Sequence, residues 1–490
     1  MSDKEKRGSM TMQFINGFLA TGLGKVSVVV LGFLGLMIAT RVIDTEQMGY
    51  FFLIQIMALF LTELSNFGMT LALPRFTADI EDADDKRLHI NTAVYFRIVT
   101  IIGACILALV LRQPFSQLFG GEIPDNLLIF LPIMVALEST GKLIVSVLQS
   151  YFKFRPIGTI SVISSVVNMA SIVLFTLVLG QGVFGLLIAK VLSRAVAFGY
   201  GTIIAPFSLR PEFDAVILRK MLWFGFPLQV NYILSFIYQR IDTFLIGVLI
   251  GTEEVAFYEI ARRIPDSLTE VFDAFIQVYF PYVSKLSAPE KRAEVSAVLN
   301  TSLRWITLIM AFGSAIALLF GTEIITTIFS TIYSASSLPF GLLMISAAVV
   351  MIDSILGYLL VAIGAPHLPP AINMVRTVVG FILYIILLPS MGMIGAAFVN
   401  ILSILIVNPI YVFVLSQRKV VVQITAFAKP LLIVHAILLL MVVVGQPVLW
   451  VRVLMVLVFL PINIFIAQET LKEALAFLKE RRLVTSSAST

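Results

Sequence analysis

The stretch from Met221 to Leu286 reads MLWFGFPLQVNYILSFIYQRIDTFLIGVLIGTEEVAFYEIARRIPDSLTEVFDAFIQVYFPYVSKL. Its apolar residues suffice for two long membrane-crossing helices, and the polar segment Gly251-Thr252-Glu253-Glu254 predicts a tight outer turn between them. The two helices nonetheless carry eight ionisable residues: Arg240, Asp242, Glu259, Arg262, Arg263, Asp266, Glu270 and Asp273. An ionisable side chain at the bilayer centre costs at least about 2.5 kcal/mol, so these residues should face protein or water rather than lipid. As a set they predict a polar cavity, although Arg262 and Asp266 lie one turn apart and can also form a structural pair.

The turn also predicts which charges lie at the same depth. If the hairpin reverses near residues 251 and 252, residues whose numbers sum to about 503 lie level, because each helix rises about 1.5 Å per residue. Asp242 is then level with Arg262, and Arg240 with Arg263. This predicts a mixed cationic and acidic cluster in the outer half of the membrane.

The composition excludes an ordinary soluble protein. Hydrophobic residues make up 59% of the 490 residues and charged residues only 13%, against about 45 to 50% and about 25% in soluble domains. The net charge of +5 comes from lysine and arginine in short loops, which indicates membrane topology rather than a nucleic-acid site. The single cysteine, Cys105, gives no disulfide framework, and three scattered histidines predict no metal centre. No cofactor is expected.

Hydropathy predicts an all-α polytopic membrane protein with about fourteen transmembrane helices. The predicted spans are 16–41, 48–72, 92–112, 126–149, 158–179, 183–205, 222–249, 255–282, 301–321, 338–363, 370–389, 393–415, 430–446 and 448–467. Lysine and arginine collect in the loops of one side, from Lys4 and Lys6 at the N-terminus to Arg481 and Arg482 near the C-terminus. By the positive-inside rule that side is cytoplasmic. We therefore expect a multi-pass protein of the cytoplasmic membrane with both termini in the cytoplasm.

An internal repeat predicts the organisation of these spans. A shift of 207 residues superposes three pairs of segments without a gap: Thr45-Glu46 on Thr252-Glu253, Leu61-Thr62-Glu63 on Leu268-Thr269-Glu270, and Arg97 on Arg304. Six helices separate the copies, an even number, so both copies enter the membrane in the same direction. The prediction is two parallel six-helix lobes of the kind seen in two-lobed transporters.

The repeat sets the expected domain boundaries. Residues 1–221 form the N-terminal lobe, 222–415 the C-terminal lobe, 416–467 an extra helix pair, and 468–490 an amphipathic tail on the cytoplasmic membrane surface. In the first copy Lys25 and Glu63 come level and can pair. In the second copy Glu270 keeps the acid, whereas Tyr232 replaces the lysine.

Enzyme motifs are not found. Thr140-Gly141-Lys142-Leu143 resembles the end of a phosphate loop, but that motif needs a glycine at Ala136 and a serine or threonine at Leu143. Asp44-Thr45-Glu46 resembles the acidic motif of membrane glycosyltransferases, but its match to the second turn favours turn chemistry. The sequence favours a transporter over an enzyme.

Several segments, in this order and spacing, resemble one family. They are Arg41-Val-Ile-Asp-Thr-Glu-Gln-Met-Gly49-Tyr50, Ser65-Asn-Phe-Gly68, Leu73-Pro74-Arg75, Gly225-Phe-Pro227, Arg240-Ile-Asp242 and Phe257-Tyr258-Glu-Ile-Ala261-Arg262. The chain is similar to polysaccharide transport proteins of the multidrug/oligosaccharidyl-lipid/polysaccharide exporter superfamily. Drug antiporters of that superfamily usually have twelve spans, and peptidoglycan-precursor flippases have a crowded arginine pattern in the first two helices that is not found here.

The resemblance implies a flippase for cell-surface polysaccharide biosynthesis. It would move a polyprenyl-diphosphate-linked oligosaccharide to the outer leaflet by alternating access, in contact with membrane lipid and with other proteins of glycan assembly. A sugar and diphosphate headgroup needs a wet, cationic path, because its polar groups would lose their hydrogen bonds in hydrocarbon. The expected substrate-binding residues are Lys25, Arg240, Arg262 and Arg263.

Transport against a gradient also needs a group that binds the coupling ion, H⁺ or Na⁺. The candidates are Glu63, Asp242 and Glu270, followed by Glu138 and Asp353. Glu138 and Lys142 lie one turn apart, a spacing at which they can simply neutralise each other. A cation-coupled small-molecule or drug antiporter is the alternative function.

Overall fold

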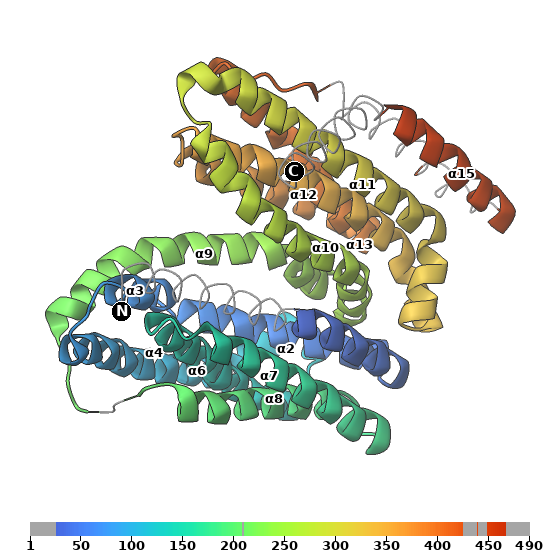
Figure 1. Cartoon of the computed structure of the whole chain (residues 1–490). Coiled ribbons are helices and arrows are strands. Elements are labelled where there is room, and N and C mark those ends of the chain that lie inside the picture. The colour runs from blue at the N-terminus through green and yellow to red at the C-terminus, as the bar shows by residue number, and fades with distance from the viewer. Residues whose placement is uncertain (1–25, 208–209, 425–438, 440–447, 467–490) are drawn as a thin grey trace, which may run out of the picture. The chain divides into compact units, whose positions relative to one another are not determined.

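The computed structural model describes residues 26–207, 210–424, 439 and 448–466 (Figure 1). The chain forms two compact units, Met1–Ala256 and Phe257–Thr490. Within the described residues, nine helices are long and apolar enough to cross a membrane. The expectation of an all-α, polytopic membrane protein is therefore confirmed.

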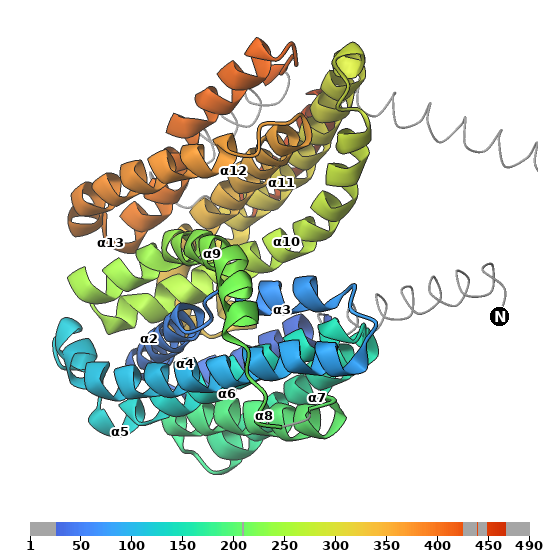
Figure 2. The ribbon, with the colours of Figure 1, turned by 90° about the vertical axis from the view of Figure 1, so that its left-hand side faces the viewer.

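Unit 1 contains the first half of the spans. Its helices are Val26–Val42, α2 (Thr45–Leu64), α3 (Met69–Thr77), α4 (Ala83–Leu118), α5 (Asp125–Leu128), α6 (Phe130–Ser150), α7 (Phe154–Ile172) with the π-helical turns Val173–Val178, α8 (Gly182–Ile204) and α9 (Ala215–Leu249). α6 packs against α2, α3, α4 and α8, and α9 packs against α2, α3 and α4. Figure 2 shows α4, α6 and α8 side by side in this unit.

Unit 2 contains most of α10 (Thr252–Lys285), then α11 (Arg292–Ile328), α12 (Ser337–Ala362), α13 (Leu368–Gln417) and α15 (Leu449–Ile466). Short 3-10 turns at Pro289–Lys291 and Thr331–Ser336 precede α11 and α12. α12 packs between α11 and α13 and is the most buried of the candidate spans in the described part of the chain. α13 reverses at Gly392 (φ 58°, ψ −145°), a conformation that glycine adopts without strain, so it holds two of the expected spans.

The predicted spans agree with the helices of both units. Twelve of the fourteen fall on described helices in full or in large part, α15 covers most of 448–467, and 430–446 lies almost entirely outside the described residues. The tail 468–490 and Lys25 also lie outside them. The helix bounds follow the repeat, since α2 begins at Thr45 and α10 at Thr252, and α6 begins at Phe130 and α12 at Ser337.

One expectation is wrong in an informative way. The span predicted at 48–72 is not continuous, because α2 ends at Leu64 and α3 begins at Met69. Between them Phe67 (φ 50°) and Gly68 (φ 77°) are both left-handed, and a helix cannot continue through that conformation. The predicted span is thus a broken helix, with the break between α2 and α3. Broken helices of this kind occur where the freed backbone groups find partners in the protein or in a water-filled cavity.

Candidate functional site

At the break between α2 and α3 the backbone packs closely against α9, and both contacting residues are glycines. A Cβ at Gly68 would lie 2.1 Å from the carbonyl oxygen of Gly225, and a Cβ at Gly225 would lie 2.8 Å from that of Gly68. Both distances are too short for any other residue without movement of the backbone. The Ser65-Asn-Phe-Gly68 and Gly225-Phe-Pro227 segments, 157 residues apart when measured from Gly68 to Gly225, therefore meet in the structure.

Side chains satisfy the backbone groups that the break frees. Gln229 on α9 donates from Nε2 to the carbonyl oxygen of Glu63 at 2.8 Å, and Arg97 on α4 donates to the carbonyl oxygen of Ser65. Asn66 donates from Nδ2 to Oε1 of Gln229 at 2.9 Å and to Oγ1 of Thr70 at 2.8 Å. Counted as whole residues, none of the four is more than 4% exposed: Glu63, Asn66, Arg97 and Gln229. The break is thus the centre of a buried polar network, as its cost in hydrocarbon requires.

Glu63 carries the negative charge of this network. Its Oε1 accepts from Nζ of Lys142 on α6, and its Oε2 accepts from Nε2 of Gln229 at 3.3 Å. The Lys142 side chain is 31% exposed, whereas the Glu63 side chain is 6% exposed. The pair therefore joins a buried carboxylate to an ammonium that is open to its surroundings. Lys25, the expected partner of Glu63, lies outside the described residues.

Arg97 adds a second positive charge to the network. It is fully buried, close enough to Glu63 to interact with its charge, and its Nε and Nη2 have no hydrogen-bond partner among the described residues. Lys142 and Arg97 against Glu63 leave one net positive charge. This net positive charge makes the region electrostatically favourable to an anion.

The expected neutralisation of Glu138 by Lys142 is wrong. Oε1 of Glu138 lies 2.7 Å from Nε of Arg194 on α8, while Lys142 pairs with Glu63. One helical turn separates Glu138 from Lys142, but each reaches a different neighbouring helix. Glu138 thus links α6 to α8, and Glu63 links α2 to α6.

The candidate arginines of α9 and α10 belong to different units. Arg240 and Asp242 lie on α9 in unit 1, where Asp242 is 2% exposed and its Oδ1 accepts from the backbone N–H of Thr243 at 2.8 Å. Arg262 and Arg263 lie on α10 in unit 2.

Arg262 forms the structural pair with Asp266 that the sequence allowed, and it also contacts Glu259. Its Nε lies 3.2 Å from Oδ2 of Asp266, its Nη1 lies 3.5 Å from Oε1 of Glu259, and its guanidinium carbon lies 5.8 Å from the centre of the Tyr258 ring. The neighbouring Arg263 has a buried Nε with no hydrogen-bond partner in the described part of the chain. The two arginines thus differ, one held by acids and one with a free donor.

The remaining candidate acids have contrasting environments. Asp353 on α12 is 7% exposed, and its Oδ2 lies 2.8 Å from Nη1 of Arg376 on α13. Glu270 on α10 is exposed. Glu63 and Glu270 are equivalent in the repeat, yet the first is buried at a helix break and the second lies on a helix without one.

The sequence interpretation missed the partners rather than the acids. Arg97, Lys142 and Gln229, which hold the break, were not among the candidate residues, and neither were Arg194 and Arg376. The available signal was Ser65-Asn66 followed by Gly68 within an apolar span, since serine, asparagine and glycine favour turns and signal a break.

The acidic segment Asp44-Thr45-Glu46 has a structural role at the start of α2. Oδ1 of Asp44 accepts from the N–H of Gln47 at 2.8 Å and caps α2, and Oγ1 of Thr45 donates to Oε1 of Glu253 at 2.6 Å. A helix N-cap is the ordinary role of an aspartate in this position. The two turns that the repeat superposes, at Thr45 and at Glu253, are therefore in direct contact.

Solved structures with the same fold are membrane transporters. The inward closed conformation of the lipid II flippase MurJ is similar with a TM-score of 0.70 and 17% identity, covering 93% of this chain and all of that one. An inward-facing multidrug transporter of the MATE family, in the MOP superfamily, is similar with a TM-score of 0.65 and 15% identity, covering 82% of this chain and 99% of that one. At these identities the likeness concerns the fold.

Relatives in sequence are named as flippases or transport proteins, in agreement with the expectation of a transporter rather than an enzyme. A probable low-salt glycan biosynthesis flippase, Agl15 of Haloferax volcanii, is 24% identical over 390 residues, which is 79% of this chain and 80% of the relative. The succinoglycan biosynthesis transport protein ExoT of Rhizobium meliloti is 22% identical over 311 residues, 61% of each chain. The family model described as "Polysaccharide biosynthesis protein" matches residues 38–338. Since that match covers more than half of the chain and agrees with the resemblance in the sequence, this protein belongs to the polysaccharide biosynthesis protein family.

Proposed function

We propose that this chain is a flippase that moves a polyprenyl-diphosphate-linked oligosaccharide across the cytoplasmic membrane for cell-surface polysaccharide biosynthesis. The observation that carries the proposal is the net positive, buried polar network at the break between α2 and α3. A span that consisted only of lipid-facing helix would need neither the break nor the charges. A diphosphate headgroup that crosses the membrane needs hydrogen-bond donors and positive charge along its path, and the partly exposed Lys142 of this network supports such a path.

The proposed substrate-binding residues are Lys25, Arg240, Arg262 and Arg263. Arginine suits phosphate because its planar fork donates two parallel hydrogen bonds. Arg263 has a buried donor without a partner, which supports its role. Arg262 is already held by Glu259 and Asp266, so binding of phosphate there would require exchange of one of these acids.

The proposed coupling mechanism is alternating access driven by H⁺ or Na⁺. Among the candidate acids, Glu63 has the strongest support, because it is buried, lies at the break and is paired with a partly exposed lysine. Binding of a cation to Glu63 would weaken the Lys142 pair and thereby change the α2–α6 contact. Asp242 follows, since it is buried near the outer end of α9.

Glu138 and Asp353 are each paired with an arginine, and Glu270 is exposed, so their case for coupling is weaker. The proposed topology keeps both termini in the cytoplasm, with proteins of glycan assembly as partners.

The test uses the full chain reconstituted in vesicles that contain a polyprenyl-diphosphate-linked oligosaccharide. Transport is measured as accessibility of the glycan to a lectin on the opposite side. Arg240→Ala and Arg263→Ala should slow transport at least tenfold, since a hydrogen bond to a charged group contributes about 1.5 to 3 kcal/mol. Arg155→Ala, at an exposed position in the first turn of α7, is the matched control.

Two outcomes would contradict the proposal. If the wild-type protein leaves the glycan inaccessible but exchanges a small cationic drug for H⁺ or Na⁺, the antiporter alternative holds. If the arginine variants fail to accumulate as folded protein, the charges are structural. Glu63→Gln should remove the dependence of transport on the ion gradient, and an unchanged dependence would exclude Glu63 from coupling.

A further inference from the structure

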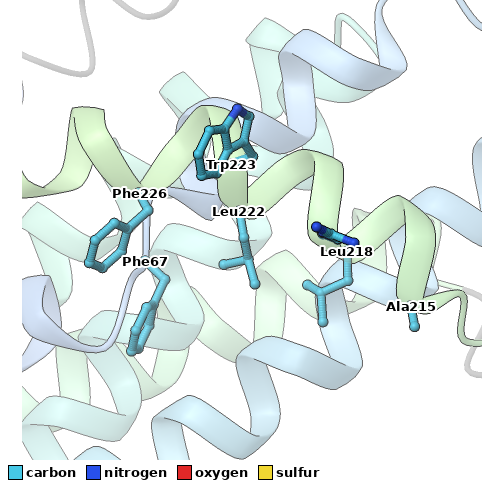
Figure 3. Close-up of a pocket in the computed structure, with 7 residues that line it drawn as sticks. Phe67, Ala215, Leu218, Leu222, Trp223 and Phe226 are labelled. Atoms are coloured by element: carbon cyan, nitrogen blue, oxygen red, sulfur yellow. The ribbon is translucent and has the colours of Figure 1, made fainter.

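An open groove lies beside the break on the surface of unit 1. Its volume is about 410 Å³, within the range of about 300 to 1,000 Å³ typical of ligand pockets. It is lined by Phe67, Ala215, Leu218, Arg219, Leu222, Trp223 and Phe226. Six of these seven residues come from the first half of α9, and the seventh comes from the break. Figure 3 shows the Phe67 and Phe226 rings next to each other, with Leu218 and Leu222 on successive turns of α9.

The break fixes one wall of this groove. Phe67 has a left-handed backbone, and its ring stacks on Phe226 with a centroid distance of 6.3 Å and meets Phe96 edge-on at 5.7 Å. The preceding residue, Asn66, donates to Gln229 in the polar network. The groove and the network that holds Glu63 are therefore connected through two consecutive residues.

The lining residues are complementary to a lipid with an anionic head group. The only ionisable lining residue is Arg219, which is exposed and adjacent to the exposed Lys220. The rest is aliphatic or aromatic, and Trp223 is 86% exposed. Arg219 and Lys220 lie in a loop-proximal turn whose positive charge places it at the cytoplasmic surface. Tryptophan and arginine at a membrane surface hold apolar chains on one side and phosphate on the other.

We infer that this groove binds the isoprenoid chain of the lipid-linked substrate next to its diphosphate, with Arg219 on the phosphate. This inference rests on the proposed function and assigns the substrate a second point of attachment, distinct from the cationic residues deeper in the membrane. One groove with one arginine fits a carrier lipid, which has one hydrocarbon chain per diphosphate, better than a phospholipid with two chains. During transport the chain stays in the membrane while the head crosses, so a site for the chain keeps the head near the path.

The test measures saturable binding of a radiolabelled polyprenyl diphosphate without glycan to the full chain in phosphatidylcholine nanodiscs. Ala215→Phe fills the groove from an exposed position, so it should not disturb the core. Val216→Phe is the matched control, because Val216 is the next residue, is 62% exposed and does not line the groove. Ala215→Phe should raise the dissociation constant about tenfold, and Val216→Phe should leave it unchanged.

The charge is tested with two ligands. Arg219→Gln should weaken binding of the polyprenyl diphosphate about tenfold and leave binding of the uncharged polyprenol unchanged, since only the former has a phosphate to pair. Equal binding by wild type and Ala215→Phe would overturn the inference, as would equal displacement by phosphatidylglycerol, which would identify a general anionic-lipid site.

Transport in vesicles separates this inference from the proposed function. If the wild type transports the glycan and Ala215→Phe binds and transports like the wild type, the function stands and the groove assignment fails. If the wild type binds the polyprenyl diphosphate in the groove but moves no glycan, the groove assignment stands and the proposed function fails.

Discussion

Replacement of Lys142 by alanine should destabilise unit 1 more than replacement of Glu63 by glutamine. In Lys142→Ala the Glu63 carboxylate, 6% exposed, loses its ammonium partner and keeps Gln229 and the nearby Arg97. In Glu63→Gln the lysine, 31% exposed, can extend its long stem toward water, so its charge stays solvated. The buried Arg97 then loses the nearby carboxylate but keeps its hydrogen bond to the carbonyl oxygen of Ser65. The expected order of stability is wild type, Glu63→Gln, then Lys142→Ala.

The magnitude follows from burial. Removal of one partner from a fully buried ion pair costs about 3 to 5 kcal/mol. Because Lys142 is partly exposed, we expect a smaller loss of unfolding free energy, about 2 kcal/mol for Lys142→Ala. For Glu63→Gln we expect a loss of about 1 kcal/mol, because the charge left without its partner is the exposed one. In a domain of 150 to 250 residues, 1 kcal/mol changes the midpoint of thermal unfolding by about 2 to 4 °C, so Lys142→Ala should lower it by about 4 to 8 °C. Unit 1 is close to that size.

The assay is thermal unfolding of the purified full chain in detergent, for both single variants and the double variant. Because the two residues act on each other, the double variant should be more stable than the sum of the single effects predicts, by about 1 kcal/mol or more. Lys153→Ala, at an exposed position, is the control for loss of a lysine. Additive single effects, or a larger loss for Glu63→Gln than for Lys142→Ala, would refute the pairing and the asymmetry of its exposure.

Three further predictions follow from the contacts. Gly225→Ala brings a Cβ within 2.8 Å of the Gly68 carbonyl oxygen and should destabilise unit 1 by about 1 to 3 kcal/mol in the same unfolding assay. If this variant were as stable as the wild type, the close approach of the two glycines would not contribute to stability. Asp44→Ala should lose about 1 kcal/mol of stability and Asp44→Asn almost none, because asparagine also caps a helix; loss of transport in the folded Asp44→Asn variant would instead give Asp44 a chemical role. Arg452 on α15 pairs with Glu323 on α11 at 2.7 Å, and we expect this pair to hold α15 against α11. In Arg452→Ala, hydrogen exchange of backbone amides should therefore rise in α15 and stay unchanged in α6. Unchanged exchange in α15 would contradict this role of the pair.

The sequence predicts the helices well because length and hydropathy decide them. An apolar run of about 20 residues must be a helix in a membrane, and the number of such runs does not depend on how they pack. Even α10, with its many charges, forms as expected. Hydropathy does not predict the break at Ser65–Gly68, because mean hydropathy is taken over about 20 residues. The four turn-forming residues change that mean little, and the span remains apolar as a whole.

Ion pairs are harder to predict because they join helices that are distant in sequence. Glu138 and Lys142 share a face by spacing, yet their partners are 56 and 79 residues away, at Arg194 and Glu63. Spacing within one helix shows which residues point the same way and gives no information on the neighbouring helix. Acids inside spans are therefore identified from sequence, and their partners require the packing.

The repeat shows where the two copies have diverged. Equivalent helices begin at Thr45 and Thr252, which argues that both descend from one arrangement, yet the first is interrupted after Glu63 and the second runs without a break past Glu270. An interruption in a membrane helix is destabilising unless other residues satisfy its backbone, and here Arg97 and Gln229 do so. A costly feature present in one copy and absent from the other is not needed for the fold. It is therefore best explained by what unit 1 does, and the groove beside Phe67 and the cationic network around Glu63 are the two features that the break creates.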